Sequence, residues 1–125
     1  MKICIALFEN RISSVFENAR CLRLYYYCRG EVRFAGEIKL DKNISPSSIL
    51  SLISSWGADI LLCGAIEKES KDFLIHRGIQ VEDWLGGQLE DVISALKRGD
   101  LSSLCTPGRN MEQDITLDLT KNNME

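Results

Sequence analysis

The sequence predicts a single α/β domain in which one mixed sheet carries helices on its faces. Three observations indicate this class. Residues 2–8 form a continuous apolar run, as in a strand buried on both faces. Residues 21–40 show the apolar alternation and central turn of a β-hairpin. From residue 45 onward, helical and strand patterns alternate at lengths that suit crossovers between parallel strands.

The N-terminal part is expected to supply three strands. The run at residues 2–8 is the first, and the polar stretch 9–18, too long for a tight turn, is expected to be a structured loop. The hairpin follows, with arms at 21–28 and 32–40 and a turn at Arg29-Gly30. Because its second arm alternates cleanly between apolar and polar residues, that arm is predicted to lie near the sheet edge with one exposed face.

The C-terminal part is expected to alternate helices and strands. Ser45-Pro46 is a strong helix start, because the serine hydroxyl accepts a first-turn amide hydrogen and proline has no amide hydrogen to lose. Gly57 is expected to end this helix. The elements that follow are strand 59–63, helix 67–77, strand 79–84 and helix 88–98. The predicted order is therefore β-β-β-α-β-α-β-α.

Domain boundaries are expected at residues 1–101, with a largely disordered tail at 102–125. The tail contains Pro107-Gly108 and several asparagines and lacks a sustained period. An alternative is that Ile115, Leu117 and Leu119, which alternate with polar residues, pair with a sheet edge.

Composition excludes several classes of protein. The 125 residues carry a net charge of −3, and no basic field points to nucleic acid. No apolar run approaches the roughly 20 residues of a membrane span, and the N-terminus has no signal-peptide pattern, so a cytoplasmic location is predicted. The five cysteines are odd in number and include no C-x-x-C pair, which argues against disulfides and a standard zinc site.

The candidate site lies at one rim of the sheet. Ligands of open α/β sheets gather outside the carboxyl ends of strands, which here means residues 9–16 and 63–67. Cys63 is expected to stand half exposed at a strand end, next to free backbone amides, as a ligand for a soft metal. The alternative for Cys63 is a small buried apolar residue.

The sequence gives little support for other kinds of metal site or for an enzyme active site. His76 is the one histidine, which excludes a histidine-rich metal site. The first strand carries no acidic residue for a two-metal nuclease, and no phosphate-binding P-loop motif is present. Gly86-Gly87 is interpreted as a turn before the last helix. An enzyme would need Cys63 as nucleophile, and the sequence supplies no base for it.

Several segments together resemble the dinitrogenase iron-molybdenum cofactor biosynthesis family, of the NifX and NafY type. They are Met1-Lys2-Ile3 and residues 11–19, 58–66, 78–81 and 89–101. The resemblance implies a ribonuclease H-like sheet, without nuclease activity, over residues 1–101. It also implies carriage of iron-molybdenum cofactor or its precursors during nitrogenase assembly.

The two loops match the family motifs in part. The family's first loop reads Ser-x-His-Phe-Gly-x-Ala, and Ser13, Phe16 and Ala19 match it. Val15 occupies the position of the histidine associated with cluster binding, and Glu17 that of the glycine. In the second loop, Cys63-Gly64-Ala65-Ile66-Glu67 keeps one glycine and the isoleucine of a Gly-Gly-Ile-Gly-like turn.

We therefore predict non-enzymatic binding or carriage of an iron-sulfur or molybdenum-containing cluster, with Cys63 as the metal ligand and cluster-assembly proteins as partners. The other predicted binding residues come from the same two loops. They are Arg11, Ser13, Ser14, Val15, Phe16, Gly64, Ala65 and Ile66.

The alternative is a metal-free interaction or regulatory module that keeps the fold, which the valine at the histidine position favours. An exposed apolar patch around Ile12, Val15 and Phe16, or a homo-oligomer through residues 32–40, would support it.

Overall fold

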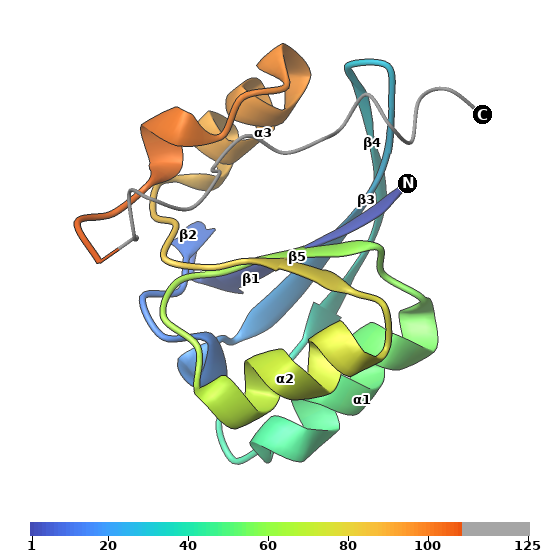
Figure 1. The fold of residues 1–125 in the computed structure, drawn as a ribbon, viewed down its shortest axis with the longest axis vertical. Helices are drawn as coiled ribbons and strands as arrows, with labels where there is room; N and C mark the ends of the chain where they lie inside the picture. Colours follow the sequence, from blue (N-terminus) through green and yellow to red (C-terminus); the bar gives the residue numbers. More distant parts are fainter. Residues whose placement is uncertain (109–125) are drawn as a thin grey trace.

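One mixed sheet organises the molecule, with strand order β4-β3-β1-β5-β6 and a short strand, β2, paired with β1 (Figure 1). The computed structural model describes residues 1–108. The central β1 runs antiparallel to β3 and parallel to β5, and β5 is parallel to β6. The strands are β1 (Lys2–Phe8), β2 (Arg11–Ile12), β3 (Cys21–Cys28), β4 (Glu31–Lys39), β5 (Ile60–Leu62) and β6 (Gln80–Glu82). The predicted mixed sheet is confirmed.

Helices cover both faces of this sheet, giving three layers (Figure 1). α1 (Pro46–Trp56) and α2 (Lys68–His76) lie on one face, and α3 (Leu89–Arg98) lies on the other. Each face has its own apolar core. The α3-side core holds Ile3, Ile5, Leu62 and Leu96, whereas the α1/α2-side core holds Cys4, Ile53, Leu61 and Leu74. Alternate residues of β1 and β5 thus face opposite cores, as expected of strands buried on both faces.

The helix signals in the sequence act as predicted. The Ser45 hydroxyl oxygen accepts a hydrogen bond from the backbone N–H of Ser48 at 3.2 Å, at the start of α1. Gly57 and Gly99 end α1 and α3 in the left-handed conformation, with φ of 79° and 73°.

One segment agrees with its prediction in more detail, and a second differs from it. The loop 9–18 contains β2 and a short 3-10 helix, η1 (Phe16–Asn18). The chain also continues to pack beyond residue 101, where a second 3-10 helix, η2 (Ser102–Leu104), buries Leu104 in the α3-side core. Disorder is therefore the wrong prediction for residues 102–108, because burial of leucine side chains anchors them. The alternation at residues 115–119 lies outside the described residues.

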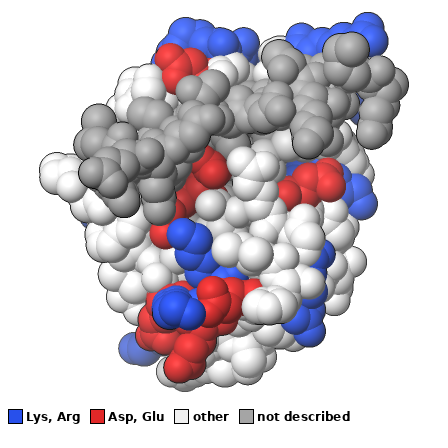
Figure 2. All heavy atoms as spheres, viewed as in Figure 1, with Lys and Arg blue, Asp and Glu red and all other residues white. Residues whose placement is uncertain are grey.

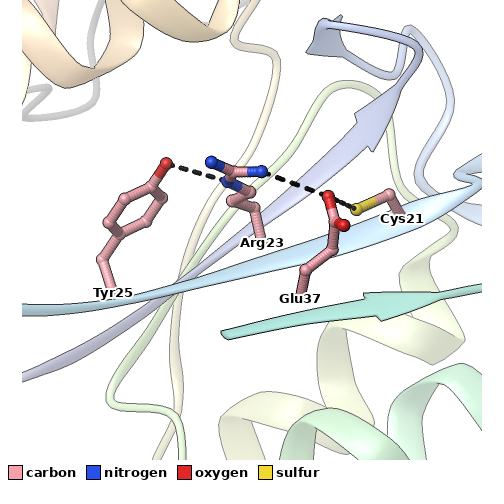
Figure 3. Close-up of polar contacts among 4 residues, drawn as sticks. All are labelled: Cys21, Arg23, Tyr25 and Glu37. Carbon is pink, nitrogen blue, oxygen red and sulfur yellow. Dashed lines mark hydrogen bonds and ion pairs between the residues drawn. The ribbon is translucent and has the colours of Figure 1, made fainter. Parts of the chain in front are cut away.

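The β3–β4 hairpin carries a polar cluster on its α3-side face (Figure 3). The Arg23 guanidinium donates from Nε to the Tyr25 hydroxyl at 3.1 Å and from Nη1 to Glu37 at 3.2 Å. The Cys21 thiol donates to the same Glu37 oxygen at 3.3 Å. Partial burial and this carboxylate raise the pKa of Cys21 to about 11. The cluster thus keeps Cys21 protonated at mildly alkaline pH, where an ordinary thiol begins to ionise.

A β-bulge in β4, the edge strand of the sheet, interrupts the regular pairing of the β3–β4 hairpin. Leu24 pairs with Gly36 and Tyr25 with Phe34, so Ala35 is the extra residue of β4.

The surface carries charges of both signs. Figure 2 shows acidic and basic side chains next to one another on the viewed face. Lys68 and Asp72 of α2, for example, form an ion pair at 2.7 Å. No helix within residues 1–108 is long and apolar enough to cross a membrane.

Candidate functional site at the ends of three strands

Three loops meet outside the carboxyl ends of β1, β5 and β6 and line a pocket of about 350 Å³. The chain leaving β5 enters α2 on one face of the sheet, and the chain leaving β6 enters α3 on the other (Figure 1). Such a divergence is where ligands bind in open α/β sheets. The lining residues are Arg11, Ile12, Ser14, Gly64, Ala65, Trp84, Leu85, Gly86, Gly87, Thr106 and Gly108.

The first two loops, which the sequence predicted to be neighbours, are joined by their backbones. The Ala65 N–H donates to the Ser14 carbonyl at 2.9 Å, and the Phe16 N–H donates to the Ala65 carbonyl at 2.7 Å. Gly64 makes this approach possible. A Cβ atom at this position would lie 2.4 Å from the Ser13 oxygen and 2.5 Å from the Ser14 oxygen. The second loop therefore requires glycine where it crosses the first.

The third loop, residues 83–87, is a part of the site that sequence reasoning missed. The Trp84 N–H donates to the Gly64 carbonyl at 3.0 Å, and the Ile12 N–H donates to the Gly87 carbonyl at 3.0 Å. From the sequence, the Gly86-Gly87 pair indicates only a turn before the last helix. The signal that could have found it is the position of this turn at the carboxyl end of a strand parallel to β5, which places it at the same rim.

Four of the nine predicted binding residues line the pocket: Arg11, Ser14, Gly64 and Ala65. The other five serve elsewhere. Phe16 is fully buried, and Ser13 is buried with its hydroxyl donating to the Val15 carbonyl at 2.7 Å. Ile66 packs against the α1/α2-side core. The apolar patch that would support the metal-free alternative does not form, because Ile12 and Phe16 are buried and, of the three residues, only Val15, 39% exposed, remains at the surface.

Cys63 is the main correction. Its side chain is fully buried in the α1/α2-side core and is not among the pocket-lining residues. The strand pairing continues past β5, since the Cys63 N–H donates to Glu82 and its carbonyl accepts from Leu85. Cys63 therefore points to the same face as Leu61, into packed side chains. The prediction that Cys63 stands half exposed is therefore wrong.

The chemistry of Cys63 agrees with its position. Burial, together with the nearby Asp83 and Glu17 carboxylates, raises the pKa of the thiol well above its usual value. A thiolate is the form that binds metals or attacks substrates, and the raised pKa opposes its formation at Cys63. Among residues 1–108, no group of three or more His, Cys, Asp or Glu side chains is placed to hold a metal ion.

Glu17, which stands at the family's glycine position, has a structural role. One carboxylate oxygen accepts the Glu67 N–H at 3.2 Å, just before α2. The Glu67 side chain does not cap the helix itself. Glu17 therefore supplies the cap from the first loop, and the negative charge suits a helix N-terminus.

The pocket itself offers positive charge and hydrogen-bond donors. Arg11 is exposed and forms no ion pair with another residue of the described chain. The backbone N–H groups of Ser14, Gly64 and Gly87 donate to no backbone or side-chain acceptor within residues 1–108. Arg11 and these three residues line the same pocket, and a guanidinium together with available backbone amides is the combination of groups that binds anions.

Comparison with known proteins identifies the family. The family model described as dinitrogenase iron-molybdenum cofactor matches residues 1–99, nearly the whole described chain. The chain belongs to this family. The match confirms the resemblance found in the sequence. Comparison of the chain with curated proteins finds no match.

Solved structures share the fold. The crystal structure of PH0822 has a TM-score of 0.72 and 22% identity, covering 82% of this chain and 95% of that one. MJ0327 of Methanocaldococcus jannaschii, provisionally named a dinitrogenase, has a TM-score of 0.65 and 22% identity, with 82% and 92% covered. TM1290 of Thermotoga, provisionally named a NifB protein, has a TM-score of 0.61 and 20% identity, with 87% and 97% covered.

At such identities the solved structures are evidence for the fold alone. The α/β fold of the family is thus confirmed, whereas the narrower ribonuclease H-like label stays a prediction.

Proposed function

We propose that this protein binds an anionic metal-sulfur cluster of the iron-sulfur or iron-molybdenum type in the three-loop pocket, and that it carries the cluster without transforming it. The observation that carries this proposal is a strand-end pocket lined by Arg11, which forms no ion pair within residues 1–108, and by residues whose backbone amides donate to no acceptor within the same residues. The chain around this pocket belongs to the dinitrogenase iron-molybdenum cofactor family. The cluster is cargo that arrives from, and leaves to, proteins of cluster assembly.

The cluster would be held by charge and hydrogen bonds. Cys63 is sealed in the core, and Val15 stands at the position of the family's histidine, so neither loop offers a soft ligand to iron. Arg11 balances negative charge, while the Ser14, Gly64 and Gly87 amides donate hydrogen bonds to cluster sulfides. A cluster bound in this way keeps its own ligands, which suits a carrier that must release it.

The test is an anaerobic titration with tetrathiomolybdate, a small coloured molybdenum-sulfur dianion, followed by calorimetry and absorption. The Arg11→Gln variant should bind at least roughly tenfold more weakly, because a hydrogen bond to a charged group contributes about 1.5–3 kcal/mol.

Arg33→Gln is the matched control, since Arg33 is an exposed arginine on β4 that does not line the pocket. It should bind like wild type. Absence of binding by wild type, or equal weakening by both variants, would reject the proposal.

A further inference from the structure

The pocket has a wall that lies outside the part of the chain matched by the family. The family match ends at residue 99, whereas Thr106 and Gly108 line the pocket beside Trp84. Residues 104–108 begin at the last residue of η2 and run along the third loop, where Leu85 and Cys105 form an antiparallel bridge. This segment thus lies beyond the family match and reaches the rim of the pocket.

Backbone hydrogen bonds fix the segment to Trp84. The Trp84 carbonyl accepts two hydrogen bonds from Thr106, one from its N–H at 2.9 Å and one from its hydroxyl at 2.8 Å. The Gly86 N–H donates to the Leu104 carbonyl at 2.8 Å. The Trp84 N–H donates to the Gly64 carbonyl. The backbone of Trp84 is therefore hydrogen-bonded on its N–H side to the second loop and on its carbonyl side to residues 104–108.

Trp84 is held in an unfavourable conformation. Its φ is 58°, in the left-handed region that a bulky residue rarely adopts. The residue is 41% exposed, so burial of the ring in a core does not explain the strain. The ring lies against Gly108, where a Cβ atom would be 2.4 Å from Cε3 and 2.6 Å from Cζ3. Because residue 108 is glycine, the backbone can pack directly against the indole ring of Trp84, which lines the pocket.

We propose that residues 104–108 position Trp84 as an aromatic wall of the pocket, and that this wall makes the site selective for sulfide-rich metal anions over their oxo counterparts. This inference rests on the proposed function. The indole face gives no hydrogen bond, so an oxo anion placed against it loses hydration without compensation. Sulfide is larger, more polarisable and a weaker hydrogen-bond acceptor than oxide, so a sulfide placed against the ring loses less hydration than an oxide does. Arg11 lines the same pocket and supplies the positive charge.

The experiment compares two dianions of the same tetrahedral shape, tetrathiomolybdate and molybdate, by calorimetry under anaerobic conditions. Wild type should prefer tetrathiomolybdate by at least roughly tenfold. Gly108→Ala, which forces the ring away, and Thr106→Val, which removes the hydroxyl donor at constant size, should reduce the preference to about threefold or less.

Two further variants separate positioning from general structure. Thr106→Ser keeps the hydroxyl and should restore the wild-type preference. Gly36→Ala is the matched glycine control, because its Cβ would lie at an ordinary 4.0 Å from the nearest atom, a Leu24 methyl carbon. In a Trp56→Phe background, in which Trp84 is the remaining tryptophan, Gly108→Ala should also increase quenching of its fluorescence by acrylamide.

The outcomes are distinct. If wild type binds neither anion, the proposed function fails and this inference fails with it. If wild type binds tetrathiomolybdate but shows no preference, or if Gly108→Ala and Thr106→Val keep the preference, this inference alone is overturned. Loss of the preference in Gly36→Ala to the same degree would overturn it as well.

Discussion

Replacing Gly64 with alanine should separate the two loops that the pocket depends on. The added Cβ would meet two carbonyl oxygens, of Ser13 and Ser14, at 2.4 and 2.5 Å, whereas real Cβ contacts practically never fall below 3.0 Å. Both atoms belong to the backbone and cannot rotate away, so the loops themselves must part.

The cost can be worked from the contacts at this crossing. Overpacking of this kind costs about 1–3 kcal/mol. The two hydrogen bonds that join the loops, between Ala65 and Ser14 and between Phe16 and Ala65, contribute about 1 kcal/mol each and are weakened by the separation. We therefore expect Gly64→Ala to lower the free energy of unfolding by about 2–4 kcal/mol.

Urea denaturation followed by circular dichroism measures this loss, with Gly36→Ala as the control in β4. Gly36 has room for a Cβ, and alanine loses less backbone entropy on folding, so the control should stay within about 0.5 kcal/mol of wild type or gain slightly. A Gly64→Ala protein as stable as wild type would refute the close crossing of the loops, as would an equal loss in the control.

The thiols allow three further predictions. Cys63→Ser should cost about 1–3 kcal/mol of stability, because it buries a hydroxyl in an apolar core, yet it should leave tetrathiomolybdate affinity unchanged; loss of binding in the folded variant would restore Cys63 as a ligand. Iodoacetamide at pH 8, read by mass spectrometry, should modify the exposed Cys28 well before Cys21, since a pKa of about 11 leaves roughly one part in a thousand of Cys21 as thiolate; the reverse order would contradict the cluster around Glu37. Finally, the raised pKa of Cys63 means that the folded state holds this proton more tightly than the unfolded chain. Its contribution to stability should be complete below about pH 9 and decline as the pH rises above it, and Cys63→Ala should reduce this alkaline slope in urea titrations.

Much of the fold could be predicted because its signals are local. The apolar run of β1, the turn of the hairpin and the caps at Ser45 and Gly57 each depend on neighbours in sequence, and the structure agrees with them. The adjacency of the first two loops also followed from sequence order, because β1 and β5 are parallel strands whose carboxyl ends share a rim.

The parts that sequence reasoning missed depend on contacts between distant residues. The burial of Cys63 depends on which face of the sheet it points to and on how far the pairing with the next strand extends past Leu62. The wall at Trp84 depends on Thr106 and Gly108, which sit in a stretch whose turn-like composition gives no sign of packing. Such pairings across the chain leave little trace in local periodicity.

The extra residue at Ala35 in β4 has a consequence for how the molecule behaves in crowded solution. Past that point the side chains of the outermost strand change sides, so that Glu37 and Lys39 project above the sheet and Glu31 and Arg33 below it. A foreign strand approaching this rim would have to accommodate both a kink and a reversal of its own inward and outward residues partway along. A bulged edge strand with charged side chains opposes the repeated addition of strands from other molecules, and this lowers the tendency of a small protein to form fibrils.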